Sequence, residues 1–274
     1  MLEILHDLFS YTFIVRALIV GTLVSLCAAL LGVSLVLKRY SMIGDGLSHV
    51  GFGALAVAMA FHWAPLPVAI PVVVVAAFLL LRLSENSKIK GDSAIALIAS
   101  SSLAIGVTVI SLASGQNADV YSYMFGSILA MKESDVYVSI ALSVVVLILF
   151  IVFYNKIFAV TFDENFAKAT GTRANLYNML IALLTAVTIV VGMRIMGTML
   201  ISSLIIFPAL SAMRIFRHFR SVVIASAVIS IICFFIGLVA SYAFSTPTGA
   251  SIVIVNLIVF LLCFAAGLIR KKAA

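Results

Sequence analysis

The sequence predicts an all-α protein that crosses a membrane many times. Hydrophobic residues make up 64% of its 274 residues and charged residues only 10%, whereas a soluble domain carries about a quarter charged residues. The charges are also bunched, because Asp, Glu, Lys and Arg are absent from 46–81, 93–118 and 221–269. A helix needs about 20 apolar residues to span the hydrocarbon, so each stretch has room for one or two spans.

The spans are expected in order along a single transmembrane domain over residues 1–274. The long stretch 221–269 holds two of them, separated near Pro247 and Gly249, because proline and glycine interrupt helices. The others are expected at 12–36, 42–61, 66–83, 93–113, 134–154, 174–191 and 196–213. The total is about nine transmembrane helices, or eight if one weak span stays at the surface.

The basic residues predict an orientation for these spans. With the basic C-terminal residues 270–272 in the cytosol, nine spans place all but three of the 17 Lys and Arg residues on the cytosolic side, as the positive-inside rule requires. The N-terminus is then outside, and the net charge of +7 reflects topology, so no nucleic-acid partner is expected. The three exceptions are Arg16, Lys132 and Arg194.

Asp45 and His49 are the most informative polar residues, because an ionisable side chain inside a span costs at least about 2.5 kcal/mol. They are four residues apart, so on a helix they share a face and lie about 6 Å apart along the axis. Carboxylate plus imidazole suits Zn²⁺, Mn²⁺ or Fe²⁺. The alternative is structural: Asp45 caps the helix beside Lys38 and Arg39, and His49 bonds a neighbouring backbone group.

Weaker metal candidates lie further out. Met59 and His62 are three residues apart, although Met also fills gaps in packing and His62 beside Trp63 resembles an interfacial anchor. Asp119 follows Gln116 and Asn117 in an expected extracellular stretch. It is either a solvated loop residue or a carboxylate that attracts cations to the mouth of a path.

Residues 161–171 predict a short amphipathic helix on the cytosolic side. Asp163 or Thr161 can cap its start and Gly171 can end it. Phe162 and Phe166 share one face. So short a helix needs a surface to dock on, which is either the membrane or a cytosolic partner.

Four stretches together resemble the permease subunits of bacterial ABC importers for zinc and manganese. They are 39–49 (RYSMIGDGLSH), 119–130 (DVYSYMFGSILA), 162–171 (FDENFAKATG), and 192–197 (GMRIMG) running to 207–209 (FPA). Gly46 departs from the pattern, since the family often has Ala or Thr there.

The resemblance implies a protein of the bacterial plasma membrane that imports a divalent metal ion, zinc before manganese or iron. It implies a homodimer, a separate ATP-binding cassette ATPase and an extracellular metal-binding protein. The metal is cargo, and no cofactor is expected to be bound permanently. Asp45 and His49 match polar positions of the metal path. The ATPase would bind the 161–171 helix through six residues: Phe162, Asp163, Glu164, Phe166, Ala167 and Gly171.

The chain is not expected to be an enzyme. It contains no G-x-x-x-x-G-K-[ST] phosphate loop, so a partner must supply the energy, which favours docking for the 161–171 helix. Three other functions remain open at this point: a permease for a chelated metal such as a siderophore or cobalamin, a stand-alone secondary transporter, and an intramembrane enzyme. The absence of H-E-x-x-H argues against a metalloprotease.

Overall fold

The structure is a computed structural model that describes residues 12–86, 91–114, 126, 133–198 and 200–273. All regular elements in these ranges are helices, which confirms the all-α class. They are α2 (Thr12–Leu37), α3 (Ile43–Ala60), α4 (Pro65–Asn86), α5 (Gly91–Ser114), α7 (Glu133–Val152), α8 (Tyr154–Phe162), α9 (Glu164–Ala169), α10 (Ala174–Met196), α11 (Ile201–Ile215), α12 (Phe219–Phe244) and α13 (Thr248–Ala273).

Eight of the described helices are long and apolar enough to cross a membrane. Each of the nine expected spans corresponds to a helix, but α11 has only 15 residues. Its length of about 22 Å falls short of a hydrocarbon layer of about 30 Å. The weak span is therefore α11.

Three expected boundaries are wrong. The break between the sixth and seventh expected spans was placed at 191–196, yet α10 continues to Met196 and α11 begins at Ile201. Residues 174–213 carry one charge, Arg194, so hydropathy does not mark the break. Gly197 makes it, with φ 84, a backbone conformation that glycine adopts without steric cost. The span expected at 134–154 ends at Val152, and the expected 161–171 helix is divided between α8 and α9.

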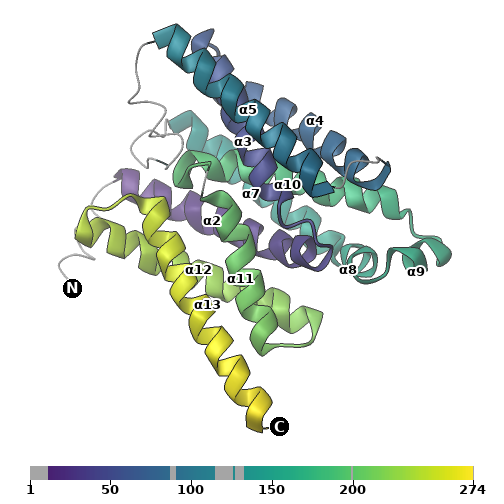
Figure 1. Cartoon of the computed structure of the whole chain (residues 1–274). Helices are drawn as coiled ribbons and strands as arrows, with labels where there is room; N and C mark the ends of the chain where they lie inside the picture. Colours follow the sequence, from purple (N-terminus) through teal and green to yellow (C-terminus); the bar gives the residue numbers. More distant parts are fainter. Residues whose placement is uncertain (1–11, 87–90, 115–125, 127–132, 199, 274) are drawn as a thin grey trace.

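The helices form two groups around a central helix. α3, α4 and α5 pack together, as do α11, α12 and α13, while α10 contacts members of both groups. α2 packs on α10, α11 and α12. Figure 1 shows the two groups diverging at the top and bottom of the view, with α8 and α9 together at one end of the bundle. We call that end the α9 end.

α3 is enclosed by other helices. Within the 18-residue apolar stretch of α3, 72% of the residues are buried, whereas the corresponding share for α13 is 11%. A Cβ on Gly53 would lie 2.8 Å from the carbonyl oxygen of Ser102 on α5, so glycine lets the two backbones approach closely. The helix that carries Asp45 and His49 is therefore held between neighbours.

Two of the basic residues expected outside are paired with carboxylates. Arg194 bonds Asp135 at 2.5 Å, and Arg16 bonds Glu133. Both acids lie in the first turn of α7. Because the Arg194 side chain is only 6% exposed, its charge needs this partner. These pairs join α2, α7 and α10 at the end of the bundle opposite α9.

Candidate functional site

A tight turn between α2 and α3 positions Asp45. Arg39 adopts a positive φ of 61, and the Tyr40 N–H returns to the Leu35 carbonyl at 2.8 Å. This closes α2 and reverses the chain. α3 then starts at Ile43, which places Asp45 in its first turn.

Asp45 and His49 lie side by side on α3. Their Oδ2 and Nε2 atoms are 3.8 Å apart, and the two side chains are 38% and 13% exposed, respectively. The other carboxylate oxygen of Asp45, Oδ1, accepts a hydrogen bond of 3.3 Å from the Ser202 hydroxyl on α11. The pair therefore lies next to the contact between α3 and α11.

The contacts expected from a purely structural role are not those observed. Met42 is the N-cap residue of α3 and makes no side-chain cap, so Asp45 does not cap the helix. His49 Nδ1 is buried and has no hydrogen-bond partner among the described residues. Such an atom is costly in a protein interior. Both side chains keep ligand atoms available.

The Oδ2 and Nε2 atoms are close enough to be bridged by one metal ion, although a tetrahedral site, with ligands roughly 109° apart, would need them slightly closer. With metal–ligand bonds of about 2.1 Å, atoms 3.8 Å apart would subtend roughly 130° at the ion. No cluster of three or more His, Cys, Asp or Glu side chains that could hold a metal occurs among the described residues. A single chain thus offers a weak site, which lets an ion leave as well as bind.

The structure does not bring the outer candidates to this pair. His62 is exposed just beyond the end of α3, and Met59 is half-buried in its last turn. His62 is 13 positions after His49, about 20 Å along a helix axis. Asp119 lies outside the described residues.

The expected 161–171 helix is two helices with a sharp bend. Thr161 and Phe162 end α8, and Asp163 adopts an extended conformation (φ −148, ψ 97). The Asp163 carboxylate accepts a hydrogen bond of 2.9 Å from the Phe166 N–H, so of the two expected caps, Asp163 and Thr161, Asp163 is the N-cap of α9. Gly171 has φ 81 just after the helix.

The residues expected to dock an ATPase divide into two sets. Phe162 and Phe166 are 58% and 65% exposed, and Asp163 and Gly171 are exposed as well. Ala167 is buried. Glu164 also turns inward, toward Lys38 after α2 and Asn178 of α10.

Glu164 is the centre of a polar network at the α9 end. Its Oε1 pairs with Lys168 at 2.8 Å, and its Oε2 accepts from Asn178 at 3.0 Å and Lys38 at 3.3 Å. Burial by itself opposes ionisation of this carboxyl, but the hydrogen bonds from Lys168 and Asn178 and the Lys38 charge outweigh burial and lower its pKa to about 2. Glu164 is therefore an anion at neutral pH.

Sequence reasoning missed three residues of these sites. Ser202 is 157 positions from Asp45, and Lys38 is 140 positions from Asn178. A serine and an asparagine inside apolar helices give no local signal of their partner. From the sequence, Lys38 is considered only for topology and as a neighbour of Asp45, although a lysine at the end of a span commonly reaches polar groups there.

These features define a class. A bundle with eight helices long and apolar enough to cross a membrane among the described residues is a polytopic membrane protein. The acid–imidazole pair on α3 and the two short helices at the α9 end are features that a transport protein could use. The chain belongs to the ABC 3 transport family, which matches residues 10–267. This confirms the resemblance drawn from the four stretches of sequence and identifies the chain as a membrane subunit of an ABC transporter.

Similar proteins cover nearly all of the chain. The manganese import system permease protein ScaB of Streptococcus gordonii is 29% identical over 249 residues, which are 91% of this chain and 89% of that protein. The manganese transport system membrane protein MntC of Halalkalibacterium halodurans is 27% identical over 245 residues, 89% of this chain and 84% of that protein. PsaBC from Streptococcus pneumoniae, solved in complex with Fab, superposes with a TM-score of 0.86 at 30% identity, covering 96% of this chain and 94% of that one.

Proposed function

We propose that this chain is the permease subunit of an ATP-driven importer of divalent transition-metal ions, and that Asp45 and His49 line the ion path. The observation that carries the proposal is the pair itself: two metal-ligating atoms 3.8 Å apart on a buried helix. A carboxylate and an imidazole in such a place are costly to insert. Binding a transported cation would account for the presence of these two side chains there.

Manganese is the cargo we propose first. The sequence-based preference for zinc rested on resemblance, whereas relatives that span this chain are named as manganese systems. The ligand atoms agree with that choice, because the Ser202 hydroxyl adds an oxygen beside the Asp45 carboxylate, and oxygen ligands suit Mn²⁺. Zinc and iron are the competitors to test.

A separate ATPase would dock on α8 and α9. The exposed rings of Phe162 and Phe166 present apolar surface at the α9 end, and the chain has no phosphate loop with which to bind ATP. Because Glu164 and Ala167 turn inward, the docking surface narrows to Phe162, Asp163, Phe166 and Gly171. In this orientation the α9 end and the C-terminus are cytosolic. The opposite end would face an extracellular metal-binding protein, with Asp119 near the mouth.

A second copy of the chain would cover the exposed face of α5. Only 22% of the apolar stretch of α5 is buried. Its exposed side chains include small ones at every third or fourth position: Ser93, Ala96, Ser100, Ala104, Thr108 and Ser111. Small residues at this spacing favour close helix packing in membranes. α5 also exposes large apolar side chains such as Leu97 and Leu112 among the small ones. On α13 most exposed side chains are large and apolar, such as Ile254, Ile258 and Leu262, and these suit lipid.

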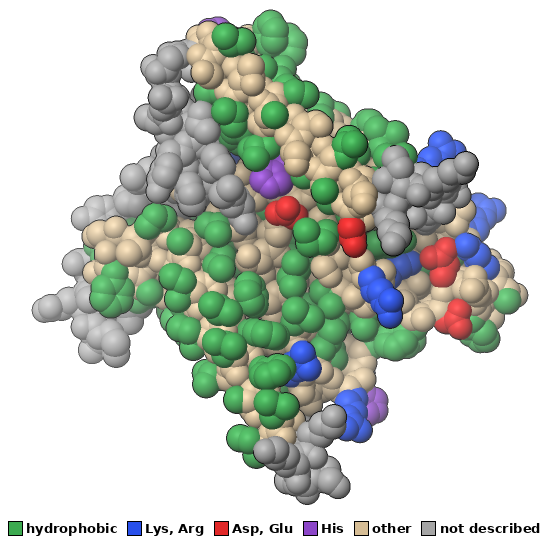
Figure 2. Space-filling model, in the orientation of Figure 1, with side chains coloured by type: hydrophobic (Ala, Val, Ile, Leu, Met, Phe, Trp, Pro, Cys, Tyr) green, Lys and Arg blue, Asp and Glu red, His purple; other side chains and the backbone are tan. Residues whose placement is uncertain are grey.

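Asp45 supports the same placement of the second copy. Its side chain is partly exposed, and a carboxylate facing lipid would be strongly unfavourable. Figure 2 shows acidic and histidine side chains at the centre of the visible face, between the regions of α5 and α11. Covering this face with another copy would enclose the pair and bring more ligand atoms to the path.

Metal uptake tests the proposal. The Asp45→Ala/His49→Ala double variant, assembled with its ATPase in proteoliposomes, should take up Mn²⁺ at least tenfold more slowly than the unaltered complex at limiting metal. Matched controls are Asp92→Asn and His218→Gln, which remove the same chemical groups from exposed positions and should leave uptake unchanged.

Competition by Zn²⁺ and Fe²⁺ in the same assay identifies the preferred ion. Normal uptake by the double variant would remove both residues from the mechanism. Uptake without ATP, or uptake only of a chelate, would contradict the proposed function itself.

A further inference from the structure

Lys38 is a buried lysine at the junction of three helices. It is the first residue after α2, and its side chain is only 7% exposed. Its ammonium group donates to the Val160 carbonyl of α8 at 3.2 Å, to Glu164 of α9 at 3.3 Å and to Asn178 of α10 at 2.6 Å. An ammonium has three hydrogens to donate, and these three acceptors lie on three different helices.

The network fixes α9 to the membrane bundle. Asn178 also donates to Glu164 at 3.0 Å, so Lys38, Glu164 and Asn178 bond one another in a closed triangle. Pulling α9 away would leave a buried ammonium without its anion, which is far less favourable than moving the two together. A displacement of α9 should therefore carry Lys38 with it.

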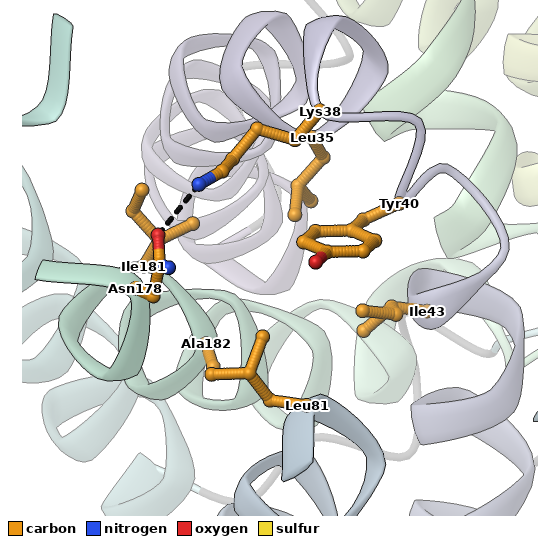
Figure 3. A pocket seen from close by; sticks show the side chains of 8 residues that line it. All are labelled: Leu35, Lys38, Tyr40, Ile43, Leu81, Asn178, Ile181 and Ala182. Atoms are coloured by element: carbon orange, nitrogen blue, oxygen red, sulfur yellow. Dashed lines mark hydrogen bonds between the residues drawn. The ribbon is translucent and has the colours of Figure 1, made fainter. Parts of the chain in front are cut away.

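Lys38 stands directly before the turn that positions Asp45. Only the turn residues 39–42 separate it from α3, and hydrogen bonds hold that turn to the end of α2. Figure 3 shows a cavity beside this turn, lined by Lys38, Tyr40, Ile43 and Asn178 among others.

We propose that Lys38 is the positioning residue that transmits movement of α9 to the α2–α3 turn and so to Asp45. This inference rests on the proposed function, in which an ATPase moves α8 and α9. Lys38 touches no cargo. It acts by linking Glu164 of α9 to the start of α3, so that the two move together.

The test compares transport with ATP hydrolysis in the reconstituted complex. Lys38→Met keeps the length of the side chain and removes its charge. It should lower the Mn²⁺ transported per ATP hydrolysed at least tenfold while the ATPase still co-purifies. Lys156→Met removes an exposed lysine of α8 and should leave this ratio unchanged. Phe166→Ala, a docking variant, should instead reduce co-purification.

Charge exchange separates transmission from simple loss of structure. Lys38→Glu and Glu164→Lys should each lower the ratio, and the double variant Lys38→Glu/Glu164→Lys should recover at least a third of it. Equal ratios in Lys38→Met and the unaltered complex would overturn the proposal. The proposal would also be overturned if the double variant transported no more Mn²⁺ per ATP hydrolysed than either single variant. This comparison can still be made if Lys38→Met fails to assemble.

A second readout does not depend on the cargo. A bimane dye on Ser41→Cys, in a background without Cys27, Cys233 and Cys263, reports on the α2–α3 turn. Adding ATP should change its fluorescence, and Lys38→Met should abolish that change. If the unaltered complex shows this change but transports no Mn²⁺, the proposed function fails and the role of Lys38 stands. If the dye does not respond in the unaltered complex, Lys38 does not transmit movement.

Discussion

Glu164 and Asp45 show how surroundings set the role of a carboxylate. Glu164 is held by Lys168, Asn178 and Lys38, and its pKa falls to about 2 although burial acts in the opposite direction. Both of its oxygens serve the fold. Asp45 receives one side-chain hydrogen bond from Ser202 and keeps Oδ2 directed toward His49. The first is a structural anion and the second is available to a cation.

The lowered pKa of Glu164 predicts how its contribution to stability depends on pH. A carboxyl whose pKa falls from 4.5 to about 2 on folding stabilises the folded protein fully above pH 4.5, and this contribution is lost as the pH falls toward 2. The difference in Tm between the unaltered protein and Glu164→Gln should therefore be constant from about pH 8 to about pH 5 and shrink below that. Measurement in detergent with a thiol-independent dye checks this. A difference that stays constant from about pH 5 down to about pH 2 would mean that the pKa is not lowered.

At the scale of helices, glycines decide how closely the elements that carry the site approach. α2 meets α11 at Gly32, where an added Cβ would lie 2.0 Å from the backbone oxygen of Ile205. A backbone atom cannot turn aside as a flexible side chain can. The same helix α11 supplies Ser202 to Asp45. The α2–α11 contact therefore sets the position of α11, and of Ser202, against Asp45.

Gly32→Ala should separate α2 from α11. Overpacking of this kind costs about 1–3 kcal/mol, so the Tm of the purified protein should fall by roughly 2–12 °C. Gly267→Ala is the matched control, since its Cβ would lie 3.2 Å from the Arg214 oxygen and needs only a small adjustment. An unchanged Tm in Gly32→Ala would show that the two helices are not in close contact.

At the scale of the whole molecule, the unevenly buried helices indicate how the chain meets its surroundings. The apolar stretches of α2 and α3 are mostly buried, whereas those of α5 and α13 are mostly not buried. α5 and α13 therefore both lie at the periphery, but one exposes many small and hydroxyl side chains and the other mainly large apolar ones. A lipid surface suits the exposed face of α13, and the exposed face of α5 is where we propose the second copy.

Cross-linking tests which helix faces the second copy. In a chain without its three cysteines, Ser100→Cys or Ala104→Cys on α5 should form a cross-linked dimer in membranes under mild oxidation. Leu262→Cys on α13, which is exposed in the single chain, should stay monomeric. A dimer through Leu262→Cys and none through the α5 positions would place the interface on α13 instead.

The sequence by itself determined the class of fold, the apolar spans, the acid–imidazole pair, the cap at Asp163 and the family. These depend on composition, on the length of apolar runs and on spacing along one helix, which are local properties. It did not place the break at Gly197, because the residues around that glycine are mostly apolar. It did not place the bend at Asp163 either, because a cap marks where a helix starts but not whether another helix ends just before it.

Only the tertiary structure brought Ser202 to Asp45 and joined Lys38, Glu164 and Asn178. The first two residues are 157 positions apart, and the other three lie at the end of α2, on α9 and on α10. No local pattern links such distant positions. Which of them meet is decided by the packing of the whole chain.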